Sequence, residues 1–450
     1  MDVLESRIAE WRAYVGRSRT VAEPDIDELE THLRDQMADL QAGGLTGDEA
    51  FLVAVKRMGD IDGLSREFAL EHSDRLWKQL VLPSKSESDS GRNSNGLIEA
   101  LLFAVAAAIT IQIALRGDGW SGDPSPWFAR NVSLFVLPFL AWYFAQRRKL
   151  PLRQSLPTAA PFVLGALVMN LYPFDPESST EMLAALHLPV ALWFAVGYAY
   201  VGGEWRSHER RMDFVRFSGE WFIYYVLIAL GGGVLMGLTL AILEPVRAGL
   251  GESVIEWVIP SGAAGAVIVA AWLVGAKQSV VENMAPVLTM VFTPLFALML
   301  TGSALTYAVT GLGSEFDREQ LAVFDALLIV VLGLVLYGLS ARESSQRAGF
   351  MDVVQLVAVA AALVLDMMVL ASMLARIGDL GFTPNRVAAL GLNLVLLVNL
   401  LGAAWLSLRL LTGRATFDRL ARWQTRYLPV FGLWAAGVVI VLPPLFAFGS

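Results

Sequence analysis

Apolar residues dominate the chain from Leu97 onward, in long runs that short polar segments separate. Each run approaches the ~20 residues that an α-helix needs to cross a ~30 Å hydrocarbon core. The pattern predicts membrane-spanning helices at about 97–115, 131–146, 157–172, 185–203, 219–243, 258–276, 285–311, 321–340, 352–375, 385–411 and 428–448. We therefore expect an all-α fold, a polytopic transmembrane bundle of about eleven spans over residues 97–450.

The first 80 residues follow a different pattern, in which single apolar positions recur at helical spacing among many charged ones. Ile8 and Trp11 fit one such helix, and Leu33 and Met37 fit the next. Residues 83–96, PSKSESDSGRNSNG, are polar and show no apolar period, which is typical of a flexible linker. The sequence thus predicts a small cytosolic helical domain at 1–80, a linker at 83–96 and the membrane domain.

Composition excludes several classes of function. Charged residues make up 17% of the chain and hydrophobic residues 55%, which is too little charged surface for several soluble domains. There is no cysteine and there are four histidines without paired spacing, so we expect no metal and no cofactor. No nucleotide-binding or nucleophile motif occurs, so the chain is not predicted to be an enzyme.

Charges outside the apolar runs predict the orientation. The loops that would be cytoplasmic carry sixteen Lys and Arg residues, and the loops on the other side carry six. Since cytoplasmic loops are enriched in positive charge, the N-terminus is expected in the cytoplasm and Ser450 outside. The first 82 residues hold ten Lys/Arg against seventeen Asp/Glu, so this acidic segment is not predicted to bind nucleic acid.

The segment from Leu363 to Trp405 holds two apolar runs joined by a short connection, RIGDLGFTPNR, from Arg376 to Arg386. Gly378 or Gly381 can adopt the positive φ that ends a helix. Thr383 is a good N-cap, and Pro384 at the first helical position loses no hydrogen bond. The two runs are therefore predicted to form an antiparallel helical hairpin.

Polar groups inside these two runs are the candidate functional site, because an ionisable residue within a span is a functional hypothesis by default. Asp366 lies about nine residues, or ~13 Å, from the outer end of its span. In a hairpin, Asn393 and Asn399 bracket that depth, and Arg386 shares a face with Asn393. The predicted polar cluster comprises Asp366, Arg376, Asn385, Arg386, Asn393 and Asn399. The alternative is a purely structural Asp366, bonded to an asparagine, with arginines that extend to the interface.

Two resemblances refine these expectations. Glu28-Leu-Glu-Thr-His-Leu33, Gly44-Leu-Thr46 and Arg57-Met-Gly-Asp60 resemble the permease-prefix or HAAS-type signalling domain, which implies a regulatory role and a protein partner in a PadR-type regulator circuit. The string ARIGDLGFTPNRVAALGLNLVLLVNL resembles the signature of a bacterial multi-pass family known as domain of unknown function 4153. That resemblance implies a bacterial inner-membrane protein and no established reaction.

Three functions follow from these observations. The leading hypothesis is a non-enzymatic regulatory, signalling or envelope-associated membrane protein that acts through its cytosolic domain and has the lipid bilayer as its environment. The first alternative is an ion-coupled secondary transporter that uses Asp366 and its Asn and Arg neighbours. The second is a multi-span glycosyltransferase in which Asp118 and Asp123 of the first outer loop would be the acidic pair.

Overall fold

The computed structural model describes residues 23–42, 87–117, 125–243, 250–276, 284–310, 318–342 and 349–449, with 5, 8, 9, 11, 12, 46, 47, 50, 51 and 54. The chain divides into two compact units, Met1–Gly91 and Arg92–Ser450. All regular secondary structure in the described residues is helical.

The first unit is built on helix α2 (Glu23–Ala42), whose Leu33 and Met37 are buried in a small apolar cluster. Charged side chains cover its surface. Arg34 pairs with Glu30 at 2.9 Å, and the Arg12 guanidinium also bonds to Glu30. These two arginines, Arg12 foremost, hold the pKa of the Glu30 carboxyl below its usual range. Leu33 and Met37 thus lie on one helix, as their spacing predicts.

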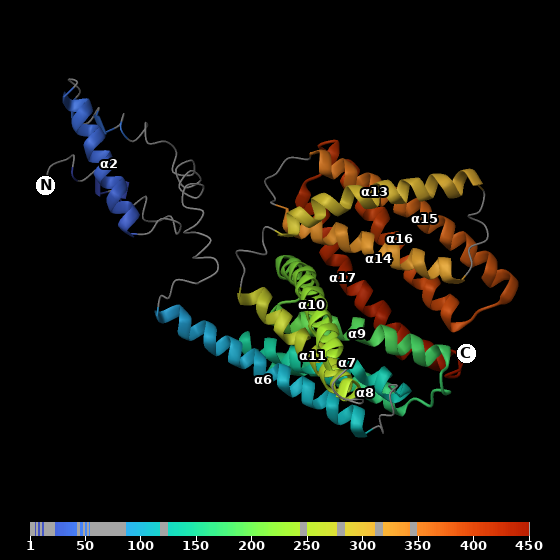
Figure 1. Cartoon of the computed structure of the whole chain (residues 1–450). Coiled ribbons are helices and arrows are strands. Elements are labelled where there is room, and N and C mark those ends of the chain that lie inside the picture. The colour runs from blue at the N-terminus through green and yellow to red at the C-terminus, as the bar shows by residue number, and fades with distance from the viewer. Residues whose placement is uncertain are drawn as a thin grey trace. The chain divides into compact units, whose positions relative to one another are not determined.

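The second unit is a bundle of long helices with short connections (Figure 1). Its helices are α6 (Glu87–Gly117), α7 (Pro126–Arg147), α8 (Leu152–Leu171), α9 (Ser179–Tyr200), α10 (His208–Leu243), α11 (Leu250–Ala276), α13 (Met284–Thr310), α14 (Arg318–Ala341), α15 (Phe350–Leu380), α16 (Pro384–Leu411), α17 (Phe417–Ile440) and α18 (Leu442–Leu445). Ten helices within the described residues are long and apolar enough to cross a membrane. The chain is an all-α, multi-pass membrane protein.

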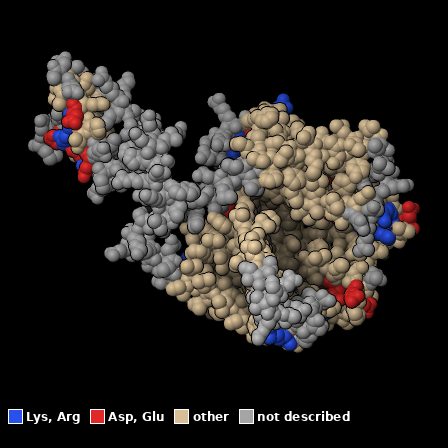
Figure 2. Space-filling model, viewed as in Figure 1, with Lys and Arg blue, Asp and Glu red and all other residues tan. Residues whose placement is uncertain are grey.

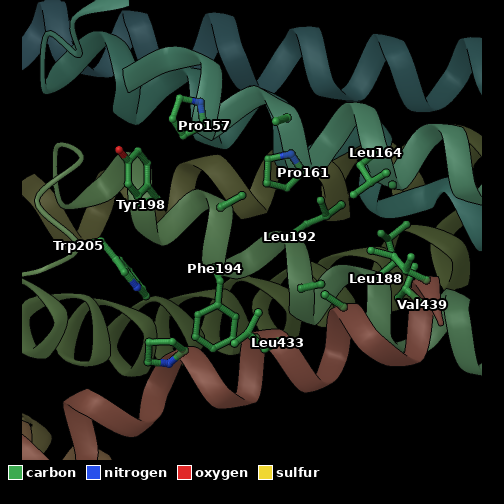
Figure 3. A pocket seen from close by; sticks show the side chains of 18 residues that line it. Pro157, Pro161, Leu164, Leu188, Leu192, Phe194, Tyr198, Trp205, Leu433 and Val439 are labelled. Atoms are coloured by element: carbon green, nitrogen blue, oxygen red, sulfur yellow. The ribbon is translucent and has the colours of Figure 1, made fainter. Parts of the chain in front are cut away.

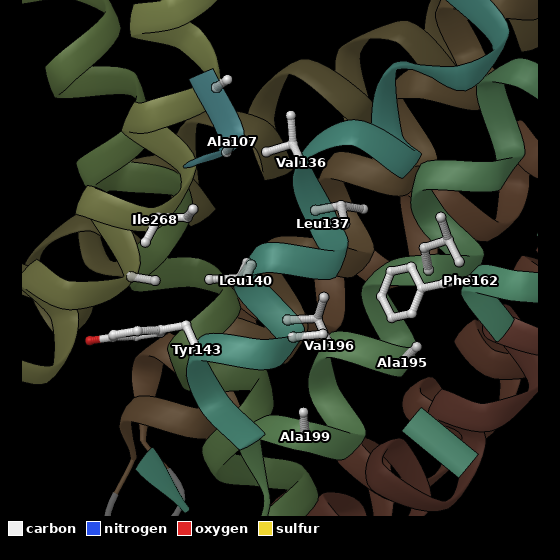
Figure 4. Packing of buried hydrophobic residues seen from close by; sticks show 14 of the residues in the cluster. Ala107, Val136, Leu137, Leu140, Tyr143, Phe162, Ala195, Val196, Ala199 and Ile268 are labelled. Atoms are coloured by element: carbon white, nitrogen blue, oxygen red, sulfur yellow. The ribbon is translucent and has the colours of Figure 1, made fainter. Parts of the chain in front are cut away.

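Two apolar cores hold the bundle together. The larger one includes side chains from α6 through α11, with Leu140 and Ile268 among those that are fully buried (Figure 4). The second joins α13 to α17 around Leu300, Leu365 and other aliphatic side chains. Helix α17 also packs against α9, and α10 packs against α14, so the two halves form one bundle.

The outer surface of the bundle is apolar. Leu102, Val105, Ile109 and Ile113 lie along one exposed face of α6. On the face shown in Figure 2, the charged side chains of the bundle lie near its margins and uncharged surface covers the middle. A continuous apolar surface of this kind is expected where lipid replaces water as the solvent.

Contacts between neighbouring helices show which connections share an end of the bundle. At one end, contacts join Arg148 to Tyr200, Arg216 to Ser340, and His208 to Asp418. At the other end, contacts join Arg130 to Glu181, Gln112 to Trp257, and Asn385 to Ser179. Among the described residues, the helix ends beside the connections predicted to be cytoplasmic thus lie at one common end. Which end faces the cytoplasm remains a prediction of the charge bias.

The predicted count of about eleven spans differs from the ten helices that qualify by length and hydropathy. The eleventh, α17, does not qualify because its first half is polar. It nevertheless extends from one end of the bundle to the other. Its Asp418 lies 3.6 Å from His208, and beyond α18 the Phe448 carbonyl accepts a hydrogen bond from the Asp175 N–H at 3.1 Å.

Several helices begin earlier than the apolar runs predict, because polar residues and prolines continue them. Helix α9 begins at Ser179, where the Ser178 hydroxyl accepts a hydrogen bond from the backbone N–H of Glu181. Helix α6 begins at Glu87, inside the segment 83–96 that its composition predicts to be a linker. Once a span has nucleated a helix, each further residue adds a hydrogen bond, so polar residues can extend it.

Candidate functional site

The candidate site lies where α14, α15 and α16 pack together. The side chains of Asp366 on α15 and Asn393 on α16 are both 0% exposed. They lie in the apolar core of the second half, among residues such as Leu365 and Val369. A carboxyl group in such surroundings is costly unless it is bonded or neutral.

Asn393 sets the geometry of the site. Its side-chain Nδ2 donates hydrogen bonds to the Asp325 carboxylate at 2.7 Å and to the Ala389 carbonyl at 2.9 Å. The same nitrogen lies 3.8 Å from the Met373 sulfur. This contact aligns Asn393 with Met373, which is seven residues from Asp366 along α15. Asp366 therefore lies about 10 Å from the level of Asn393, measured along the axis of α15.

Asp325 is a member of the site that the sequence prediction omitted. It is half-buried near the start of α14, and its carboxylate accepts the hydrogen bond from the Asn393 amide. The interface of α14, α15 and α16 therefore holds two carboxyl groups, and one of them bonds to the Asn393 amide. Within the described residues, neither carboxyl group forms an ion pair with an arginine, lysine or histidine.

The Asp366 carboxyl group has no hydrogen-bond partner among the described residues. Both of its oxygens are buried, and neither accepts a bond. The Asn393 Oδ1 atom is unpartnered in the same way. Buried polar atoms without partners are uncommon in native structures, and they concentrate at sites that bind or exchange something.

The other predicted residues lie elsewhere. Asn399 is fully buried, but its amide donates to Gln424 of α17 at 2.9 Å, so it belongs to the interface between α16 and α17. The Asn385 amide donates to the Ser179 hydroxyl at 3.0 Å and joins the start of α16 to the start of α9. The predicted cluster is thus divided, because Asn393 bonds to α14, Asn399 to α17 and Asn385 to α9.

Both predicted arginines also lie away from Asp366. The Arg386 guanidinium donates to the carbonyls of Leu380 and Gly381, at 3.0 and 2.7 Å, and so bonds to the last carbonyls of α15 rather than extending inward. Arg376 is ten residues from Asp366 on the same helix, about 15 Å of rise. The structure does not form the predicted track from Arg386 through Asn393 to Asp366.

Elsewhere, the described part of the bundle holds an apolar hollow and no cluster of metal-binding residues. A hollow of about 550 Å³ lies between α8, α9 and α17, lined by apolar side chains such as Pro161, Leu192 and Leu433, with no acidic or basic residue (Figure 3). The described residues include no group of three or more histidines or carboxylates that could hold a metal ion. Asp118 and Asp123, the pair behind the glycosyltransferase alternative, lie outside the described residues.

Comparison with known proteins adds no assignment. No protein-family model matches the chain, and searches of curated proteins and of solved structures find no match either. The resemblances to the prefix domain and to the family of unknown function therefore rest on the sequence motifs alone. Any function must be argued from the site itself.

Proposed function

We propose that the protein is a proton-coupled secondary transporter in which Asp366 and Asp325 form the coupling site. The observation that supports this proposal is the fully buried Asp366 carboxyl group, which has no partner among the described residues and lies on a helix that packs against α14, the helix of Asp325. A structural carboxyl group in a membrane helix is normally bonded. This one is left able to gain or lose a proton.

The arrangement favours a proton over a metal cation. A buried carboxyl group can take up or release a single proton without any further ligand. A bound calcium ion takes six to eight oxygen ligands, and magnesium takes an octahedral set. The three side chains Asp325, Asp366 and Asn393 supply fewer. Exchange of one proton is the simplest chemistry that these groups support.

A hydrophobic carbodiimide provides a test that needs no knowledge of the transported substrate. Such a reagent partitions into the bilayer and reacts with protonated carboxyl groups. The full-length protein in lipid vesicles should be labelled at Asp366 or Asp325, and labelling should decrease as the pH is raised. Mass spectrometry locates the adduct. Labelling confined to the exposed Asp379, at the end of the same helix, would contradict the proposal.

Complementation gives the functional readout. Asp366→Asn should leave the amount of protein in the membrane unchanged but remove any phenotype that the intact gene restores. Asp379→Asn makes the same chemical change on the exposed end of α15 and is the matched control. If both variants restore the phenotype equally, Asp366 has no role in transport.

A regulatory function through the first unit is the second candidate. Its supporting observation is that residues 1–91 form a compact unit of their own, with a buried cluster around Leu33. By its resemblance to the prefix domain, this unit would bind a protein partner in a PadR-type regulator circuit of a bacterial inner membrane. Deletion of residues 1–80 should then abolish regulation while the membrane domain still inserts. A deletion that leaves regulation intact would exclude this role.

A further inference from the structure

A polar cavity of about 460 Å³ lies between the ends of α7, α9 and α11 and the first turns of α10. Its charged lining consists of Arg147, Arg148, Arg210, Arg216, Asp213 and Glu220. Four positive and two negative side chains leave it with a net positive charge. The cavity lies at the end of the bundle that the charge bias assigns to the cytoplasm. Its lining residues do not include Asp325 or Asp366.

The charges of the α10 residues are largely matched within the protein. Arg210 pairs with Glu204 at 3.1 Å and lies 3.9 Å from Asp213. The Arg216 guanidinium donates to the Ser340 carbonyl, and Glu220 lies one helical turn further along the same face. These α10 residues line one side of the cavity.

The two arginines at the end of α7, Arg147 and Arg148, have at most one acidic partner each among the described residues. Arg147 donates to the Tyr143 hydroxyl at 2.6 Å, and its nearest carboxylate, Glu99, is 4.0 Å away, the outer limit of an ion pair. The Tyr143 hydroxyl points away from the labelled apolar residues around it (Figure 4). Arg148 lies over the Tyr200 ring at 5.2 Å, and among the described residues its guanidinium forms no hydrogen bond. Its donors are available to a ligand.

We propose that this cavity binds a phosphate-bearing anion, held chiefly by Arg147 and Arg148. A guanidinium group presents paired N–H donors that match two phosphate oxygens, and stacking on a tyrosine ring fixes its orientation. The cavity volume is in the range of small-ligand sites. A phosphate group at this depth could belong to an anionic lipid headgroup or to a soluble phosphate, since basic cavities between helices near the cytoplasmic surface suit both.

The experiment uses the full-length protein in phosphatidylcholine nanodiscs. One arm adds phosphatidylglycerol to the bilayer and measures the lipid retained by native mass spectrometry. The other arm adds inorganic phosphate and measures the thermal unfolding midpoint. Retention of phosphatidylglycerol alone identifies a lipid headgroup, and a response to inorganic phosphate identifies a soluble ligand. Either result supports the site, and no response in either arm overturns it.

Matched variants separate a defined site from general surface charge. Arg147→Gln with Arg148→Gln should weaken binding about tenfold or more, the effect of losing hydrogen bonds between charged groups. Arg414→Gln with Arg419→Gln removes the same charge just before α17 and in its first turn, outside the cavity, and should leave binding unchanged. Equal loss in both double variants would show that only surface charge matters.

A milder variant guards against misfolding. Arg148→Lys keeps the positive charge but loses the paired donors, so it should fold normally and bind the anion more weakly than the wild type. Binding equal to that of the wild type would refute the role assigned to the Arg148 guanidinium group.

Discussion

Replacement of Asp366 by an apolar residue should stabilise the protein. In the folded bundle, both carboxyl oxygens are buried without a partner among the described residues, in an otherwise aliphatic core. A buried polar group without a hydrogen bond costs about 1–3 kcal/mol. Asp366→Val removes that cost with little change in volume. We therefore expect the free energy of unfolding to rise by about 1–3 kcal/mol.

The size of the replacement and the lipid environment limit this gain. Asp366→Leu removes the same polar group but adds volume to a packed core, which costs about 1–3 kcal/mol in typical cases. Lipid is as apolar as leucine, so no hydrophobic term is added. Asp366→Val is therefore expected to be the most stable variant, and Asp366→Leu should lie close to the wild type because its gain and its packing cost are similar in size. Asp366→Asn should resemble the wild type because its amide is left equally unpartnered.

Unfolding by sodium dodecyl sulfate in mixed micelles, followed by circular dichroism, measures these differences. Asp379→Val on the exposed end of α15 should change the free energy of unfolding by less than about 0.5 kcal/mol. If Asp366→Val and Asp366→Leu both destabilise the protein by more than about 1 kcal/mol, the carboxyl group has a stabilising partner. The argument that it is unsatisfied would then fail.

Three further predictions concern other parts of the chain. The arginine partners of Glu30 hold its pKa below the usual 4.5, so the interaction stabilises the first unit above pH 4.5 and is lost as the pH falls through the lowered pKa. The helicity of fragment 1–80 should therefore decrease only below about pH 4.5. Glu30→Gln should remove this acid-induced loss of helicity. A reporter fused after Ser450 should behave as extracytoplasmic, and activity only in the cytosol would contradict the eleven-crossing arrangement. Gly402→Ala should destabilise the bundle by about 1–3 kcal/mol, since its Cβ would lie 2.2 Å from an indole atom, whereas Gly437→Ala, with open space around it, should not.

Local sequence signals predicted the hairpin of α15 and α16 correctly. Gly381 has a φ of 73°, the conformation that ends α15. Thr383 accepts a hydrogen bond from the Arg386 backbone N–H at 3.4 Å, and Pro384 begins α16. These features depend on the backbone preferences of neighbouring residues, so one sequence is enough to predict them.

The direction in which Asn399 points follows from helix geometry that the prediction did not apply. Asn393 and Asn399 are six residues apart, and at about 100° per residue they point to different sides of α16. One therefore bonds to Asp325 of α14 and the other to Gln424 of α17. In a hairpin of two helices only one of them can face α15, and α16 has further neighbours on its other sides.

The role of Asp325 could not be read from its position in the sequence. It lies close to the start of a predicted span, where a carboxyl group can reach the lipid–water interface and needs no special account. Only the packing of α14 against α16 shows that it bonds to a buried amide. The role of Arg147 and Arg148 could not be read from the sequence either. Counting positive charges in the loops uses both residues to predict orientation, and it gives no sign of a cavity beside them.

The distribution of unsatisfied polar atoms argues that stability alone does not explain the second half of the bundle. Elsewhere in α16 and α17, packing is tight enough to place a tryptophan ring against a glycine at Gly391 and at Gly402. In the same helices and in α15, buried atoms of Asp366, Asn393 and Gln424 have no partner among the described residues. A core that packs this closely could have accommodated aliphatic side chains at those positions. Their retention is expected where polar groups must change partners during function, at a cost in stability.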